Sequence, residues 1–293
     1  MLLTEVVKNT RTGHYAVGSF SPRYLRAIRP VLLAAQAKNS PIIVQVSQRE
    51  LGRYHATPAQ FAERHRALLK ELAISVPVTL HLDHTKDFAF IKDAIEQGFE
   101  SVMIDASELP LEENISITRE VVEYAHQRGA NVEAELGKIA SNDQIETDGD
   151  DSELYTDPRE AGYFVEKTGV DALAISVGTA HGAYIAKKPR VDTGRIREIR
   201  AYTDIPLVLH GASGVPAEMI HRATELDCGG VSKVNIATDL ETAFLKSLGL
   251  DHPLTNETVG DCAPDALERA WNAVQETVEI KIRDFVRSEN KAW

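Results

Sequence analysis

Short, almost continuously apolar segments alternate along the chain with longer segments in which apolar residues recur every three or four positions. The first pattern predicts buried β-strands and the second predicts amphipathic helices. The strand segments cover 15–20, 42–46, 77–80, 101–105, 131–136, 170–177, 205–209 and 229–236. About eight strands, each followed by a helix, are typical of a (β/α)8 TIM barrel with right-handed crossovers.

Capping residues indicate where helices begin. Ser21-Pro22 predicts a helix after the first strand, and Thr57-Pro58 predicts one after the second. His65 lies on the apolar face of this second helix, so we expect it to pack in the core rather than take part in chemistry.

Two segments depart from the alternation. Residues from about 137 to 157 are dominated by Ser, Asn, Asp, Gly and Glu, which indicates either disorder or a functional loop over an active site. A helical extension at about 263–289 follows the last strand, and its apolar stripe suits either a subunit contact or packing against the barrel's own helices. We therefore expect residues 1–293 to form a single TIM-barrel domain with an additional C-terminal helix.

Composition and charge exclude several classes of protein. The chain is 43% hydrophobic and 26% charged, and no apolar run approaches the roughly 18 residues of a membrane span. A formal net charge of −12 argues against wholesale binding of nucleic acid. The two cysteines offer no disulfide framework, and the N-terminus carries no secretory signal, so we expect a cytoplasmic protein.

Three histidines each follow an apolar strand segment closely. They are His84, His181 and His210. In a barrel, the carboxyl ends of the strands meet on one rim, and reactive residues lie there. Three imidazoles that converge on one ion and leave a position open would form a catalytic zinc site.

Other polar residues are expected on the same rim. Asp83 directly precedes His84 and suits either an acid–base role or the support of a histidine. Ser21, Ser47, Asp105 and Glu135 are also expected on this rim, with Asp105 as a candidate metal ligand. Donors for a phosphate are expected from Gly182, Gly211, Ser213, Asn235 and Thr238. A single glycine of this set would more simply serve a turn.

Five motifs resemble those of the class II (zinc-dependent) ketose-bisphosphate aldolases, especially the tagatose- and fructose-bisphosphate members. The motifs are HLDH (81–84), VEAELG (132–137), GTAHG (178–182), LHGAS (209–213) and KVNIAT (233–238). They occur in family order, and the likeness covers essentially residues 3 to 247. The resemblance implies reversible cleavage of a ketose 1-phosphate or 1,6-bisphosphate to dihydroxyacetone phosphate and an aldehyde such as glyceraldehyde 3-phosphate.

The resemblance also implies individual roles. His84, His181 and His210 match the zinc ligands, and Glu135 matches the acid that holds the ion in an alternative position. Asp83 matches the group that exchanges a proton with the hydroxyl on carbon 4. The pocket for the carbon 1 phosphate, with a monovalent cation (Na⁺ or K⁺), matches Gly182, Gly211, Ser213, Asn235 and Thr238. A homodimer or homotetramer acting on a small phosphosugar is expected.

The chain departs from the family pattern near the distal end of the substrate. Ser21 stands where the fructose and tagatose enzymes have asparagine, and Glu241 stands where relatives carry Arg or Lys facing the distal phosphate. Ser47, their other distal contact, is retained. Arg49 and Arg53 could supply the missing positive charge from another direction.

The polar loop also differs from the family. Ala140-Ser141 replaces a glycine pair, which leaves Asp143 and Glu146 as candidates for a second proton transfer.

Three alternatives stay open from the sequence. The substrate of an aldolase could lack a phosphate on its distal carbon. A metal-dependent sugar-phosphate isomerase or epimerase would use the same scaffold and the same kinds of residue. Outside enzymes, a sugar-phosphate sensor would require loss of a ligand or of Asp83, and both are retained.

Overall fold

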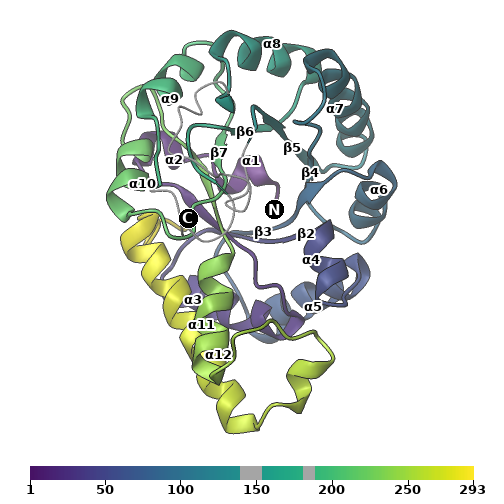
Figure 1. The fold of residues 1–293 in the computed structure, drawn as a ribbon, viewed down its shortest axis with the longest axis vertical. Coiled ribbons are helices and arrows are strands. Elements are labelled where there is room, and N and C mark those ends of the chain that lie inside the picture. The colour runs from purple at the N-terminus through teal and green to yellow at the C-terminus, as the bar shows by residue number, and fades with distance from the viewer. Residues whose placement is uncertain (139–153, 181–188) are drawn as a thin grey trace.

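A computed structural model describes residues 1–138, 154–180 and 189–293. Within these residues, eight parallel strands close into a barrel in the order β1 to β8, as the alternation predicts (Figure 1). The strands are β1 (Val17–Phe20), β2 (Ile42–Ser47), β3 (Val78–Thr85), β4 (Ser101–Ile104), β5 (Asn131–Leu136), β6 (Ala172–Ile175), β7 (Leu207–Leu209) and β8 (Lys233–Ile236). The predicted (β/α)8 barrel is therefore confirmed.

Most helices surround the barrel on its outer face, whereas the first helix packs against interior strand residues at the N-terminal end (Figure 1). The helices are α1 (Leu3–Val6), α2 (Thr10–Gly13), α3 (Ile28–Ala37), α4 (Gln48–Arg53), α5 (Pro58–Glu71), α6 (Phe88–Glu96), α7 (Leu111–His126), α8 (Pro158–Thr168), α9 (Thr193–Arg200), α10 (Ala217–Thr224), α11 (Thr238–Leu248) and α12 (Pro264–Ile280), with short η1 (Leu25–Ala27), η4 (Thr258–Asp261) and η5 (Lys281–Phe285). Across its described residues the structure contains no helix with the length and apolar character that crossing a bilayer requires.

Apolar packing closes the N-terminal end of the barrel. Interior strand residues such as Ile43, Met103 and Val208 form one cluster with Leu3 and Val6 of α1. The side chain of Thr79, near the start of β3, donates a hydrogen bond to the Met1 carbonyl at 2.7 Å. Because this end is filled, polar chemistry is confined to the opposite rim.

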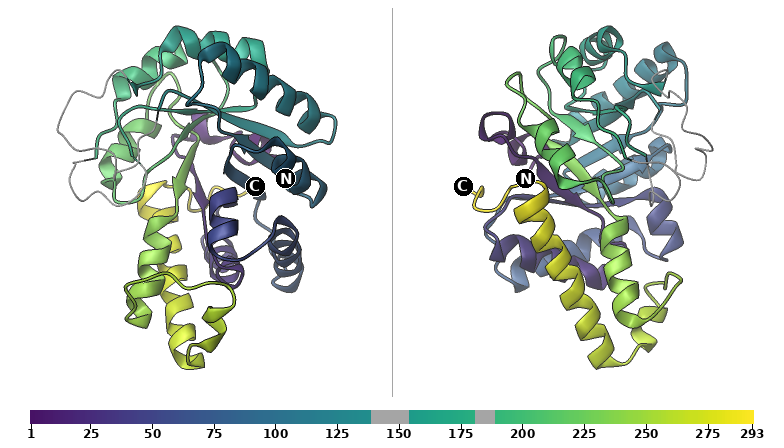
Figure 2. Two further views of the ribbon diagram at one scale, coloured as in Figure 1. Left: turned by 45° about the vertical axis from the view of Figure 1, so that its right-hand side comes forward. Right: turned by 60° about the vertical axis from the view of Figure 1, so that its left-hand side comes forward.

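The C-terminal helix packs within its own chain. It contacts α11 and α3, and the rings of Trp271 and Phe244 stack with their centroids 4.4 Å apart. Leu267, Val274 and Val278 of the predicted stripe are buried. Figure 2 shows α11 and α12 side by side, extending past the barrel. Of the two uses considered for this stripe, the structure shows packing against the barrel's own helices.

The expected helix start at Ser21-Pro22 is wrong. The chain stays non-helical to Tyr24, and α3 begins only at Ile28, after the turn of η1. Instead of capping a helix, the Ser21 hydroxyl donates to Glu50 at 2.8 Å. The residues after β1 therefore form part of the rim of the barrel instead of a helix. By contrast, α5 begins after Thr57 as predicted, and its His65 is buried.

Candidate active site

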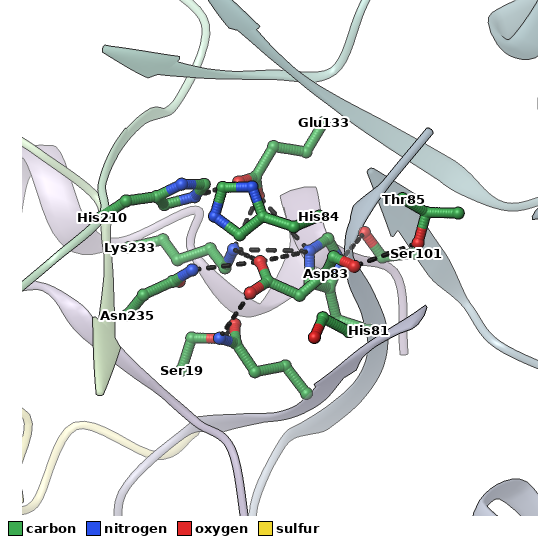
Figure 3. Close-up of polar contacts among 12 residues, drawn as sticks. Ser19, His81, Asp83, His84, Thr85, Ser101, Glu133, His210, Lys233 and Asn235 are labelled. Atoms are coloured by element: carbon green, nitrogen blue, oxygen red, sulfur yellow. Dashed lines mark hydrogen bonds and ion pairs between the residues drawn. The ribbon is translucent and has the colours of Figure 1, made fainter. Parts of the chain in front are cut away.

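An irregularity in β3 turns two consecutive side chains toward the rim. The register with β4 shifts between Leu82 and Thr85, and His84 has a φ of 28°. In a regular strand, neighbouring side chains point to opposite faces, and a bulge changes that direction. Ligand atoms of Asp83, His84 and His210 consequently lie within 4.8 Å of one another. Figure 3 shows these three side chains converging from β3 and from the end of β7.

Carboxylates surround the two described histidines. The Nδ1 atom of His84 lies 2.9 Å from Asp105 Oδ2. In His210, Nδ1 lies 3.2 Å from Glu135 Oε2. Burial alone would lower the pKa of His84, but the charge of Asp83 and the hydrogen bond with Asp105 raise it to about 10. This strongly negative environment favours a cation between the rings.

The residues present fit a divalent metal. Atoms of His84, Asp105 and Glu135 form a second group within 4.8 Å, and it shares His84 with the first. Imidazole nitrogens with one or two carboxylates are the donor set that zinc prefers in catalytic sites, and the carboxylate contacts orient the rings. His181, the expected third histidine, lies outside the described residues.

Asp83 is held by two side-chain amides. Gln45 Nε2 donates to its Oδ2 at 3.1 Å, and Asn235 Nδ2 donates to its Oδ1 at 3.0 Å. Burial alone would raise the pKa of Asp83, but the positive charges of His84 and Lys233 hold it below its usual range. An ionised carboxylate fixed beside the histidines is suited to accept a proton.

A buried ion pair supports the site from inside the barrel. Lys233 is fully buried, and its Nζ donates to Glu133 Oε2 at 2.8 Å. Glu133 Oε1 also lies 2.9 Å from His210 Nε2, and His81 Nε2 lies 3.4 Å from Nζ of Lys233. Although His81, Asp83 and Glu133 could hold a metal by distance, the ammonium group of Lys233 lies among them. Neither Glu133 nor Lys233 is among the candidate site residues predicted from the sequence, because only the closed barrel brings the two strands together.

The expected phosphate donors lie at the ends of β7 and β8. The Ser213 hydroxyl accepts hydrogen bonds from the backbone N–H groups of Ala237 and Asp239, each at 3.4 Å, where α11 begins. Gly211 has a φ of 64°, and a Cβ there would lie 2.3 Å from the Ala180 carbonyl oxygen. Glycine at 211 therefore serves the backbone turn. Gly182 lies outside the described residues.

Ser21 and Ser47 meet at one carboxylate. Ser47 begins α4 as a capping box: its Oγ accepts from the Glu50 N–H at 3.1 Å, and Glu50 accepts from the Ser47 N–H at 3.0 Å. Glu50 also accepts from Ser21, as described above. The S-x-x-E spacing at 47–50 is a readable capping signal that the sequence analysis missed.

Charged side chains complete the β1–β2–β8 side of the site. Arg23 pairs with both Glu50 and Glu241, and the Tyr54 hydroxyl donates to Glu241. A single cavity of about 1080 Å³ is lined both by these residues and by His84, Asp105 and Glu135. Glu241 does face this cavity, as expected, but the cation beside it is Arg23, which the sequence analysis did not single out.

Several sequence expectations cannot be placed. Asp143, Glu146, Ala140-Ser141 and most of the polar loop lie outside the described residues. Lys138 and Leu154, on either side of that loop, line the cavity.

Comparisons with known proteins agree with this geometry. A family model described as fructose-bisphosphate aldolase class-II matches residues 2–291. The chain is 39% identical over 284 residues to a fructose-bisphosphate aldolase of Staphylococcus epidermidis, covering 97% of this chain and 96% of the relative. It is 41% identical over 247 residues to one of Geobacillus stearothermophilus, covering 84% and 83%. The solved structure of the YdjI aldolase of Escherichia coli K12 superposes with a TM-score of 0.83 at 30% identity, covering both chains completely.

Proposed function

The chain belongs to the class II fructose-bisphosphate aldolase family, and we propose that it cleaves a ketose 1-phosphate or 1,6-bisphosphate of the fructose or tagatose type. The products are dihydroxyacetone phosphate and an aldehyde such as glyceraldehyde 3-phosphate. The observation that carries this proposal is the position of Asp83, which two amides hold beside His84 and His210. Aldol cleavage requires such a base next to an electrophile.

We propose that the metal is Zn²⁺ and that His84, His181 and His210 hold it. Glu135 would hold the ion in an alternative position, and Asp105 orients the His84 ring through its hydrogen bond to Nδ1. When bound, zinc supplies Lewis-acid stabilisation of the negative charge that develops on the substrate oxygens. Glu133 orients the His210 ring through its contact with Nε2 of the imidazole.

Asp83 moves the proton that starts cleavage. Its carboxylate takes the proton of the hydroxyl on carbon 4, the bond between carbons 3 and 4 breaks, and carbon 4 becomes the aldehyde carbonyl. The bonding electron pair stays on the dihydroxyacetone phosphate half as an enediolate, which then gains a proton at carbon 3. We assign that second proton to the polar loop, with Asp143 and Glu146 as candidates.

The carbon 1 phosphate is assigned to the start of α11. Backbone N–H groups at a helix N-terminus favour an anion, and Gly211, Ser213, Asn235 and Thr238 line this part of the cavity. Oδ1 of Asn235 has no hydrogen-bond partner among the described residues. This acceptor suits either a substrate hydroxyl or a monovalent cation, Na⁺ or K⁺. Gly182 completes the proposed set.

We also propose that residues 1–293 form one domain, that the chain assembles as a homodimer or homotetramer, and that it acts in the cytoplasm. The two free cysteines support a reducing compartment.

An enzyme-coupled assay for dihydroxyacetone phosphate tests the proposed reaction. Fructose and tagatose 1-phosphates and 1,6-bisphosphates should be compared, with borohydride added in a parallel reaction. We expect release from at least one ketose and no trapped Schiff base, because the buried Lys233 is engaged by Glu133. A trapped lysine adduct would overturn the metal-dependent mechanism.

A further inference from the structure

Three charged side chains form one wall of the cavity. Arg23 follows β1, Glu50 lies on α4 after β2, and Glu241 lies on α11 after β8. Because β8, β1 and β2 are neighbours in the barrel, these residues share one sector of the rim. The group around His84 comes from β3 and β5 and from the residues directly after β4 and β7. We call Arg23, Glu50 and Glu241 the charged wall.

Contacts within the charged wall fix its geometry. Arg23 Nε donates to Glu50 Oε1 at 2.9 Å, and its Nη1 pairs with Glu241. All three side chains are only 13–15% exposed. Arg23 also has a φ of 62°, a left-handed conformation that is uncommon outside glycine. The fold therefore holds the Arg23 guanidinium between two carboxylates at a conformational cost.

The charged wall carries one negative charge in excess. By formal charge it consists of one guanidinium and two carboxylates. Burial alone would lower the pKa of Arg23, but the charges of Glu50 and Glu241 raise it above its ordinary value, so the guanidinium stays protonated. Arg49 and Arg53 line the same cavity, but both are exposed on α4, and neither forms an ion pair with a described residue. Exposed charges are screened by water and salt, whereas the half-enclosed wall is screened less.

We propose that the charged wall receives the aldehyde end of the substrate and selects an uncharged, hydroxylated end over a phosphate. This inference rests on the proposed aldolase function. Each oxygen of Glu241 accepts one hydrogen bond, from Tyr54 or from Arg23, and a carboxylate oxygen can accept two. Hydroxyl groups can therefore donate to Glu241, while a phosphate dianion is repelled by it. The substrate class is a ketose 1-phosphate whose distal carbon bears no phosphate.

Steady-state kinetics on four ketoses test the charged wall. We expect kcat/KM of the wild type to favour fructose and tagatose 1-phosphates over the matching 1,6-bisphosphates by about tenfold or more, as expected for one excess charge at short range. Glu241→Gln keeps the size and removes the charge, so it should reduce this preference by about tenfold, mainly through KM of the bisphosphates. Glu71→Gln is a matched control, because it removes one acid that is exposed and paired only at the surface; its preference should equal that of the wild type.

A second pair of variants tests whether the exposed arginines, Arg49 and Arg53, bind a distal phosphate. Arg49→Ala and Arg53→Ala should leave the preference unchanged. A wild type that prefers bisphosphates, and loses that preference in these variants, would show that α4 binds a distal phosphate and would overturn the inference while the aldolase function stands. Absence of dihydroxyacetone phosphate from all four ketoses would overturn the proposed function, and the inference with it.

Discussion

Asn235 donates a hydrogen bond from Nδ2 to Oδ1 of Asp83 at 3.0 Å, although 152 residues separate them in the chain. Gln45 binds the other carboxylate oxygen at 3.1 Å. With both oxygens engaged, the Asp83 carboxylate has one orientation at the carboxyl end of β3. The proposed role of Asp83 as a base requires such a fixed orientation before any substrate arrives.

Replacing Asp83 by alanine should lower kcat by about 10² to 10⁴, the usual scale for a positioned acid–base group. Metal content should stay near that of the wild type, because the proposed ligands are histidines. Asn235→Ala should lower kcat less, since Gln45 still holds one oxygen. Steady-state kinetics and metal analysis of Asp83→Ala distinguish the two roles. If the metal is lost together with activity, Asp83 supports the metal site instead of transferring a proton.

Removal of the metal should abolish cleavage, and added Zn²⁺ should restore it. His210→Ala and His181→Ala should each lose both metal and activity, because a site with three protein ligands tolerates the loss of one poorly. His55→Ala is a matched control, since His55 is exposed and pairs with Glu257 on the surface. Atomic absorption and the coupled assay measure the two quantities. Full activity in metal-free protein would rule out a class II mechanism.

Lys233→Met should destabilise the fold by about 3–5 kcal/mol, because it leaves the carboxylate of Glu133 buried without its cation. The double variant Lys233→Met with Glu133→Gln should recover more than half of this loss, since the unpaired charge is also removed. Denaturant unfolding of the wild type, Lys233→Met and the double variant gives the comparison. A Lys233→Met protein within about 1 kcal/mol of the wild type would show that the ion pair contributes little.

The sequence predicted the barrel and the positions of Asp83, Ser213 and Asn235 on its rim. This was possible because buried parallel strands have a local pattern and because their carboxyl ends meet by topology. The capping box at Ser47 and Glu50 is equally local, because its S-x-x-E spacing can be read directly from the sequence.

Other parts of the site depend on contacts that no local pattern contains. Arg23 acquires its role only from Glu50 and from Glu241, which lies 218 residues further along the chain. Arg23 also has a left-handed backbone conformation, which is incompatible with the helix that Ser21-Pro22 predicts. Likewise, Lys233 and Glu133 look like separate anomalies in two strands until the barrel closes and brings them within 2.8 Å.

Protonation of His65 should make the fold sensitive to mild acid. His65 is buried on α5, and its Nε2 has no hydrogen-bond partner among the described residues. Burial, with smaller effects of the N-terminal ammonium group and Arg66, lowers the pKa of His65 to about 4, against an ordinary value of 6.5. The unfolded chain therefore binds a proton more readily than the folded one. Stability from the neutral ring is complete above pH 6.5 and is lost as the pH falls toward about 4.

The expected loss from His65 alone is about 3 kcal/mol between pH 7 and pH 4. His65→Leu removes the titrating group, so the free energy of unfolding of this variant should fall by about 3 kcal/mol less than that of the wild type over the same interval. His55→Gln, on the exposed surface, should follow the wild type. Urea unfolding at several pH values measures all three proteins. Equal pH dependence in the wild type and in His65→Leu would mean that His65 is protonated in the folded state without cost, and that the core around α5 admits its charge.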